Sequence, residues 1–92
     1  MAFKKLRSIR LPYAKQGQIY FALLNYRTQP KKVRERIDRL IHDAANGEKE
    51  YEAALREWLI DDERWDKVIQ KHYLSDKVLI TMRKKVYENW DK

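Results

Sequence analysis

Residues 30–47 read PKKVRERIDRLIHDAANG, and this stretch carries the clearest helical pattern in the chain. Its apolar residues recur at i, i+4, i+7, i+8 and i+11, on one face of an α-helix: Val33, Ile37, Leu40, Ile41 and Ala44. Pro30 is suited to a first helical turn, because proline lacks the N–H that would be unpaired there. Gly47 is a strong stop, because glycine accepts the left-handed conformation at C′ without steric cost. We therefore predict a helix over residues 30–45.

Outside this stretch, apolar periodicity predicts four further helices, over about residues 15–27, 48–59, 61–72 and 76–90. Asp61 is predicted to cap the start of the fourth helix, with Ile60 and Trp65 in contact as a hydrophobic staple. Ser75 is predicted to cap the fifth helix. No stretch alternates as a strand does. The fold class that follows is an all-α single small domain of about five helices, with a C-terminal helix-turn-helix over about residues 61–91.

The chain of 92 residues divides into a basic N-terminal arm over residues 1–13, predicted to be extended, and a helical domain over residues 14–92. It contains no cysteine, which excludes a disulfide framework and a thiolate zinc site. No apolar run approaches the roughly 18 residues that a membrane span needs. The N-terminus also lacks the apolar region of a signal peptide. We therefore expect a cytoplasmic protein with no membrane partner.

The net charge of +7 is unevenly distributed along the chain. Residues 1–42 carry eleven basic and two acidic side chains, a net charge of +9. Residues 43–66 carry three basic and nine acidic side chains, a net charge of −6, and residues 67–92 have a net charge of +4. Two basic blocks that flank an acidic one favour an oriented surface for an anionic partner, nucleic acid first.

The last two predicted helices are separated by about three residues, as in a helix-turn-helix. The apolar positions that lock such a pair are present at Ile69, Leu74, Leu79 and Met82. Tyr73 stands where the tight turn most often has glycine. Because a side chain makes the left-handed conformation costly, this residue predicts a longer or differently shaped turn. An ordinary pair of antiparallel helices, the second merely basic, is the alternative.

The outward face of the last predicted helix supplies the candidate base contacts. Lys77, Thr81 and Lys84 fall within about 60° of one another on a helical wheel. Lysine and threonine reach base edges when such a helix enters the major groove. Phosphate contacts are predicted at Lys4, Lys5, Arg7 and Arg10 of the arm, at Lys32, Arg36 and Arg39 of the helix over residues 30–45, and at Lys71 and Lys85.

Residues 65–90, WDKVIQKHYLSDKVLITMRKKVYENW, resemble the C-terminal helix-turn-helix of small regulators carried by phages and conjugative elements of Gram-positive bacteria. In outline they are similar to region 4 of bacterial sigma factors. The residues that carry the resemblance are Leu74, Ser75, Asp76, Leu79, Arg83, Lys84 and Tyr87. The segment over residues 20–41 also looks like proteins of such elements. The resemblance implies a regulator or accessory DNA-binding protein and leaves its operator open.

The sequence contains no nucleophile elbow, P-loop or dinucleotide fingerprint, so we do not expect an enzyme. The acids of residues 61–66 are better explained as a helix N-terminus than as a metal site, because the loop glycine of a calcium-binding hand is missing. His42 and His72 lie in no metal-ligand spacing, and we expect structural or surface roles for both. No metal and no cofactor are therefore predicted.

The function predicted from these features is double-stranded DNA binding by a transcriptional regulator or accessory factor of a phage or mobile element. The acidic helix over residues 48–59 is a candidate contact for RNA polymerase or another protein. A helical module that binds protein or RNA without reading DNA is the alternative. The oligomeric state is left open.

Overall fold

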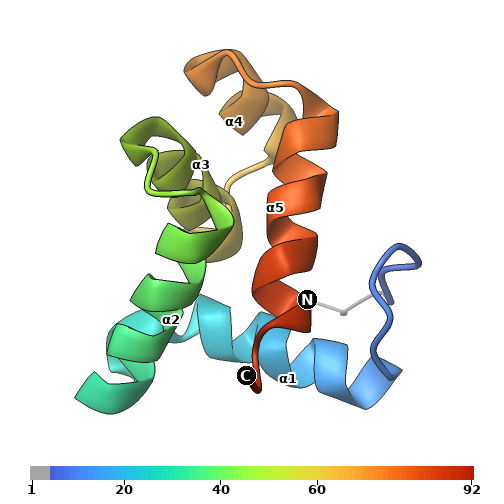
Figure 1. Ribbon diagram of the computed structural model, residues 1–92, viewed down its shortest axis with the longest axis vertical. Coiled ribbons are helices and arrows are strands. Elements are labelled where there is room, and N and C mark those ends of the chain that lie inside the picture. Colours follow the sequence, from blue (N-terminus) through green and yellow to red (C-terminus); the bar gives the residue numbers. More distant parts are fainter. Residues whose placement is uncertain (1–4) are drawn as a thin grey trace.

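The computed structural model describes residues 5–92, and within them every regular element is helical, which confirms the all-α prediction. Five α-helices and one 3-10 turn follow one another in a single domain (Figure 1). Their bounds are α1 Tyr13–Leu24, η1 Tyr26–Thr28, α2 Lys31–Ala44, α3 Lys49–Leu59, α4 Trp65–His72 and α5 Asp76–Glu88. The predicted helix over residues 15–27 is thus a shorter helix followed by a separate turn.

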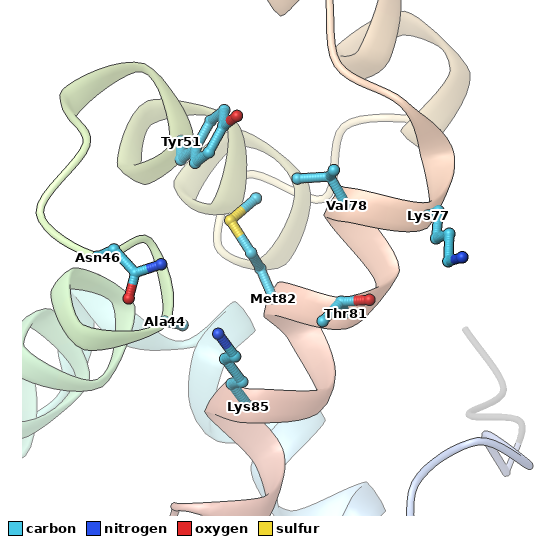
Figure 2. Close-up of a pocket in the computed structure, with 8 residues that line it drawn as sticks. All are labelled: Ala44, Asn46, Tyr51, Lys77, Val78, Thr81, Met82 and Lys85. Carbon is cyan, nitrogen blue, oxygen red and sulfur yellow. The ribbon is translucent and has the colours of Figure 1, made fainter.

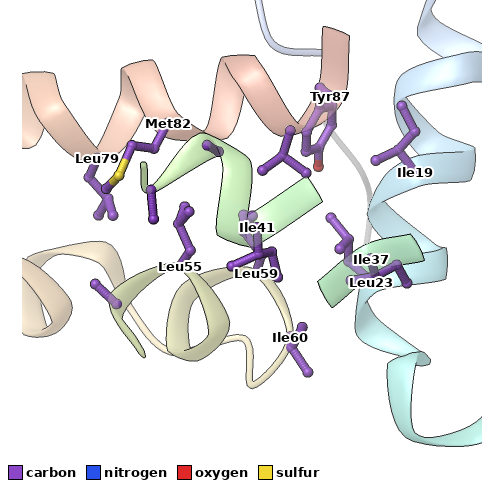
Figure 3. Close-up of a cluster of buried hydrophobic side chains, with 14 of the residues drawn as sticks. Ile19, Leu23, Ile37, Ile41, Leu55, Leu59, Ile60, Leu79, Met82 and Tyr87 are labelled. Atoms are coloured by element: carbon purple, nitrogen blue, oxygen red, sulfur yellow. The ribbon is translucent and has the colours of Figure 1, made fainter. Parts of the chain in front are cut away.

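The helices α2 and α5 lie side by side and run in opposite directions, α1 crosses near the C-terminal end of α5, and α3 and α4 pack on each other (Figure 1). The core lies between them and draws on every long helix (Figure 3). Its fully buried side chains include Ile19, Leu23, Ile37, Ile41, Leu55, Val68, Leu79, Val86 and Tyr87. The apolar stripe predicted over residues 30–45 faces this core.

The end of α2 is a Schellman motif, in which two backbone N–H groups beyond the helix bond to carbonyls of its last turn. Asn46 N–H donates to the Asp43 carbonyl at 3.1 Å, and Gly47 N–H donates to the His42 carbonyl at 3.0 Å. Asn46 has φ 54° and Gly47 has φ 75°. The stop is where the sequence predicts it, but Asn46, not Gly47, occupies C′.

The two predicted helix caps in the C-terminal half have opposite outcomes. The Ser75 cap is confirmed, because its hydroxyl oxygen accepts a hydrogen bond from Val78 N–H at 3.2 Å. The prediction of an Asp61 cap is wrong, because α4 begins at Trp65. The Asp61 carboxylate instead binds the Arg27 guanidinium at 2.6 Å. The predicted staple fails for the same reason, since Trp65 begins the helix rather than ending its first turn and is 45% exposed.

The first described residues are anchored by a glutamine. The side chain of Gln16, fully buried, donates to the carbonyls of Leu6, Ile9 and Leu11 at 3.2, 3.1 and 3.0 Å. Its Oε1 accepts from Leu6 N–H at 2.8 Å. Ile9 is 2% exposed and belongs to the core. Residues 5–12 therefore form a bent, packed segment rather than an extended arm.

Candidate nucleic-acid interface

The connection between α4 and α5 is short and contains a tyrosine in the left-handed conformation. Tyr73 has φ 55° and ψ 42°, and Leu74 N–H donates to the Ile69 carbonyl at 3.0 Å. The prediction of a longer or differently shaped turn is therefore wrong. The left-handed conformation is tolerated without a clash because the Tyr73 side chain is 94% exposed. Its cost is about 1 kcal/mol, which the packing of the two helices offsets.

The position of α4 is fixed by a buried histidine between two glutamates of α3. Nε2 of His72 lies 2.7 Å from Glu57, and its Nδ1 contacts Glu50. Burial alone lowers the pKa of His72, but the hydrogen bonds to both carboxylates outweigh it and raise the net value. A doubly protonated, positively charged ring therefore joins α4 to α3. Lys71, a predicted phosphate contact, bonds to Glu57 at 3.2 Å in the same cluster.

The outward face of α5 carries the predicted base contacts, and its N-terminal half is the more accessible. Lys77 and Thr81 are exposed, whereas Lys84 is half-buried. Among the described residues, no carboxylate forms an ion pair with these lysines or with the exposed Lys85. Ile80 is also exposed, at 37%, which is unexpected for an isoleucine. The face thus combines free ammonium groups with a hydroxyl and an aliphatic side chain.

Two separate hollows lie next to α5 or to the residues that follow it. The apolar hollow, of about 280 Å³, is lined mainly by Ala44, Tyr51, Val78 and Met82, with Asn46, Lys77, Thr81 and Lys85 at its edges (Figure 2). The basic hollow, of about 230 Å³, lies between α2 and the residues that follow α5 and is lined by Arg36, Arg39, Leu40, Asp43, Asn89 and Lys92. The predicted base contacts thus border the apolar hollow, and the basic face of α2 borders a separate hollow.

The predicted phosphate contacts fall on two sides of α5. Arg36 and Arg39 belong to the basic hollow; Arg36 also lies over the Trp90 ring at 5.7 Å and 3.8 Å from Asp91. Lys32 is exposed on the preceding turn of α2.

On the other side, Lys5, Arg7 and Arg10 line a shallow hollow of the segment over residues 5–12. That segment meets the C-terminal end of α5, where Arg10 N–H donates to the Glu88 carboxylate at 3.2 Å. Lys4 lies outside the described residues.

Arg83 belongs to the basic C-terminal block but not to this surface. Its guanidinium lies 4.5 Å from the centre of the Trp58 ring of α3, and burial lowers its pKa. Its Nε is buried with no hydrogen-bond partner in the described part of the chain. Arg83 therefore holds α5 against α3 by a cation–π contact, and one charge counted in the C-terminal block is half-buried against α3.

Over residues 5–92, no three or more histidine and carboxylate side chains are grouped so as to hold a metal ion. The helices of the same range are too short or too polar for any of them to cross a membrane. Comparisons of the chain with protein-family models, with curated proteins and with solved structures find no match.

Proposed function

We propose that this protein binds double-stranded DNA and that α4 and α5 act as a helix-turn-helix. The observation that carries the proposal is the accessible face at the start of α5. It begins directly after a short, capped turn, and Lys77 and Thr81 are exposed there without an acidic partner in the described chain. In helix-turn-helix proteins it is the N-terminal part of the second helix that contacts base edges.

The surroundings of α5 support contacts to the DNA backbone. The basic hollow adds Arg36 and Arg39 on one side, and the segment with Lys5, Arg7 and Arg10 adds cations on the other. A duplex that receives α5 in its major groove presents phosphates on both sides of that helix. Binding then weakens steeply with salt, because each phosphate contact releases counterions. Lys84, half-buried, and Lys71, paired with Glu57, are the weakest of the proposed contacts.

The test is a fluorescence anisotropy titration with duplex DNA selected from a random pool, at fixed salt. Changing Lys77, Thr81 and Lys84 together to alanine is expected to weaken binding at least tenfold. Lys67→Ala is the matched control, because Lys67 is an exposed lysine of α4 without an ion pair in the described chain. If the triple variant binds as the parent does while it remains folded, α5 is not the reading helix.

The biological setting that we propose is regulation of, or an accessory role in, transcription of a phage or mobile element, in the cytoplasm. RNA polymerase or another protein is the proposed partner of α3. Several α3 carboxylates are engaged within the chain, since Glu50 and Glu57 hold His72 and Glu52 lies 3.4 Å from His42. Competition between duplex DNA and structured RNA separates the main proposal from an RNA-binding module.

A further inference from the structure

The apolar hollow has features that contacts to a DNA backbone do not use. Tyr51 of α3 and Val78 and Met82 of α5 converge in it, and Figure 2 shows these three side chains gathered between the two helices. Val78 and Tyr51 are only half-buried although they adjoin the core, so part of their apolar surface is open to solvent. A phosphate or sugar gains little from such a surface, whereas an apolar side chain removed from water there is stabilised.

One edge of the apolar hollow is cationic. Lys85 extends toward Asn46 across the opening, whereas the Lys77 side chain is directed away from Tyr51 and Met82 (Figure 2). The Lys85 ammonium group forms no ion pair within the described chain, so it is available to a carboxylate of a partner. The volume of about 280 Å³ accommodates one large side chain but not a folded domain.

From this combination we infer a second binding site: the apolar hollow docks an acidic segment of a partner protein. One bulky apolar side chain of that segment enters between Tyr51, Val78 and Met82. A flanking aspartate or glutamate pairs with Lys85. Methionine suits such a site, because its flexible thioether adapts to different apolar shapes. The occupant is a protein segment rather than a small amphipathic anion, because the hollow is open and a segment continues past its edges to reach Lys85.

The site shares Lys77, Thr81 and Lys85 with the surface proposed to contact DNA. An acidic segment in the hollow would therefore exclude duplex DNA from α5, and the partner would act as a competitor of DNA. This consequence rests on the proposed function, whereas the docking site itself does not.

The experiment selects binders of the full chain from a library of random displayed 12-residue peptides. Fluorescence anisotropy then measures the binding of labelled copies of the enriched peptides. The expected peptides carry Phe, Leu, Trp or Met next to Asp or Glu. Lys85→Glu is expected to weaken their binding at least tenfold, and Lys67→Glu, the same charge change on α4, less than twofold. Val78→Glu, at a half-buried position of the hollow, is the second variant, with circular dichroism as the check of folding.

The proposal is overturned if no peptide is enriched, if the enriched peptides lack acidic residues, or if both hollow variants bind them as Lys67→Glu does. It is equally overturned if the hollow mediates a dimer, seen as sedimentation of the parent at twice the mass and of Val78→Glu as a monomer. Added duplex DNA is expected to displace the peptide. If the peptide binds but DNA does not, the proposed function is refuted and the docking site is supported. If DNA binds without displacing the peptide, only the proposed competition is refuted.

Discussion

The carboxylate of Glu57 lies 2.7 Å from Nε2 of His72, and the opposite nitrogen of the same ring contacts Glu50. Two acceptors on one imidazole require both nitrogens to carry hydrogen, which only the charged ring provides. The link between α3 and α4 is therefore ionic. The imidazole is largely shielded from solvent, because His72 is 8% exposed, whereas the side chain of Glu50 is 63% exposed.

This link makes stability depend on pH. The pKa of His72 is raised in the folded state, so its contribution is complete below the ordinary histidine value and is lost as pH rises through the folded pKa. We expect the free energy of unfolding, measured by urea titration, to fall by about 1–3 kcal/mol as pH rises from about 6 through the folded pKa of His72. The pKa of Glu57 is lowered by His72 and Lys71 despite its burial, so a second loss is expected as pH falls through the acidic range.

His72→Gln is the control for the alkaline loss. Glutamine keeps a hydrogen-bonding side chain but does not titrate, so the variant is expected to lose most of the dependence above about pH 6. An equally steep alkaline decline in His72→Gln would contradict the assignment to this residue.

Gln16 is expected to control the ordering of residues 5–12. Gln16→Leu keeps the volume but leaves the carbonyls of Leu6, Ile9 and Leu11 without their donor, which predicts a loss of about 1–3 kcal/mol. Urea titration measures this loss, and hydrogen exchange at Leu6 N–H is expected to accelerate. Gln18→Leu, on the exposed side of the same helix, is the matched variant and should change stability by less than about 0.5 kcal/mol.

The protein is expected to be more stable with glycine than with tyrosine at position 73. Tyr73→Gly removes the steric cost of the left-handed conformation at φ 55° and is expected to raise the free energy of unfolding by about 0.5–1 kcal/mol. Tyr73→Ala keeps the Cβ and should give no such gain. A gain of the same size in both variants would show that the tyrosine ring, not the backbone conformation, is the source of the cost.

Ser75→Ala is expected to destabilise the start of α5. Its hydroxyl is the acceptor for Val78 N–H, and loss of an N-cap side chain costs about 1 kcal/mol. Ser8, exposed in the segment over residues 5–12, provides the comparison, since it caps no helix. Thermal unfolding of the two alanine variants is the measurement, and a Ser75→Ala variant as stable as Ser8→Ala would refute the role of the cap.

Local chemistry explains which parts of the structure the sequence predicts. Ser75 and the stop after Ala45 depend on neighbouring residues only, and both are found. The exposure of Lys77 and Thr81 likewise follows from helical periodicity. Asp61 fails as a cap because its partner is Arg27, 34 residues away. A contact between residues so far apart in the sequence cannot be predicted from a local pattern.

Gln16 and Arg83 also have partners that local sequence patterns do not predict. Each is a polar residue in a helix, which by composition alone suggests a surface position. Gln16 is buried because carbonyls of an irregular segment supply its partners, and Arg83 is half-buried because it packs on the Trp58 ring. Neither partner follows from spacing along the helix that carries the residue. The surface charge of α5 is consequently smaller than the sequence suggests.

The antiparallel pairing of α2 with α5 has a consequence for synthesis on the ribosome. Leu79, Met82, Val86 and Tyr87 complete the core, yet they are synthesised after the other helices that form it. Until α5 emerges, the apolar face of α2, with Ile37 and Ile41, lacks this neighbour (Figure 3). The core therefore cannot close before α5 has been synthesised, and any product that stops before α5 exposes apolar surface of α2 to chaperones and proteases.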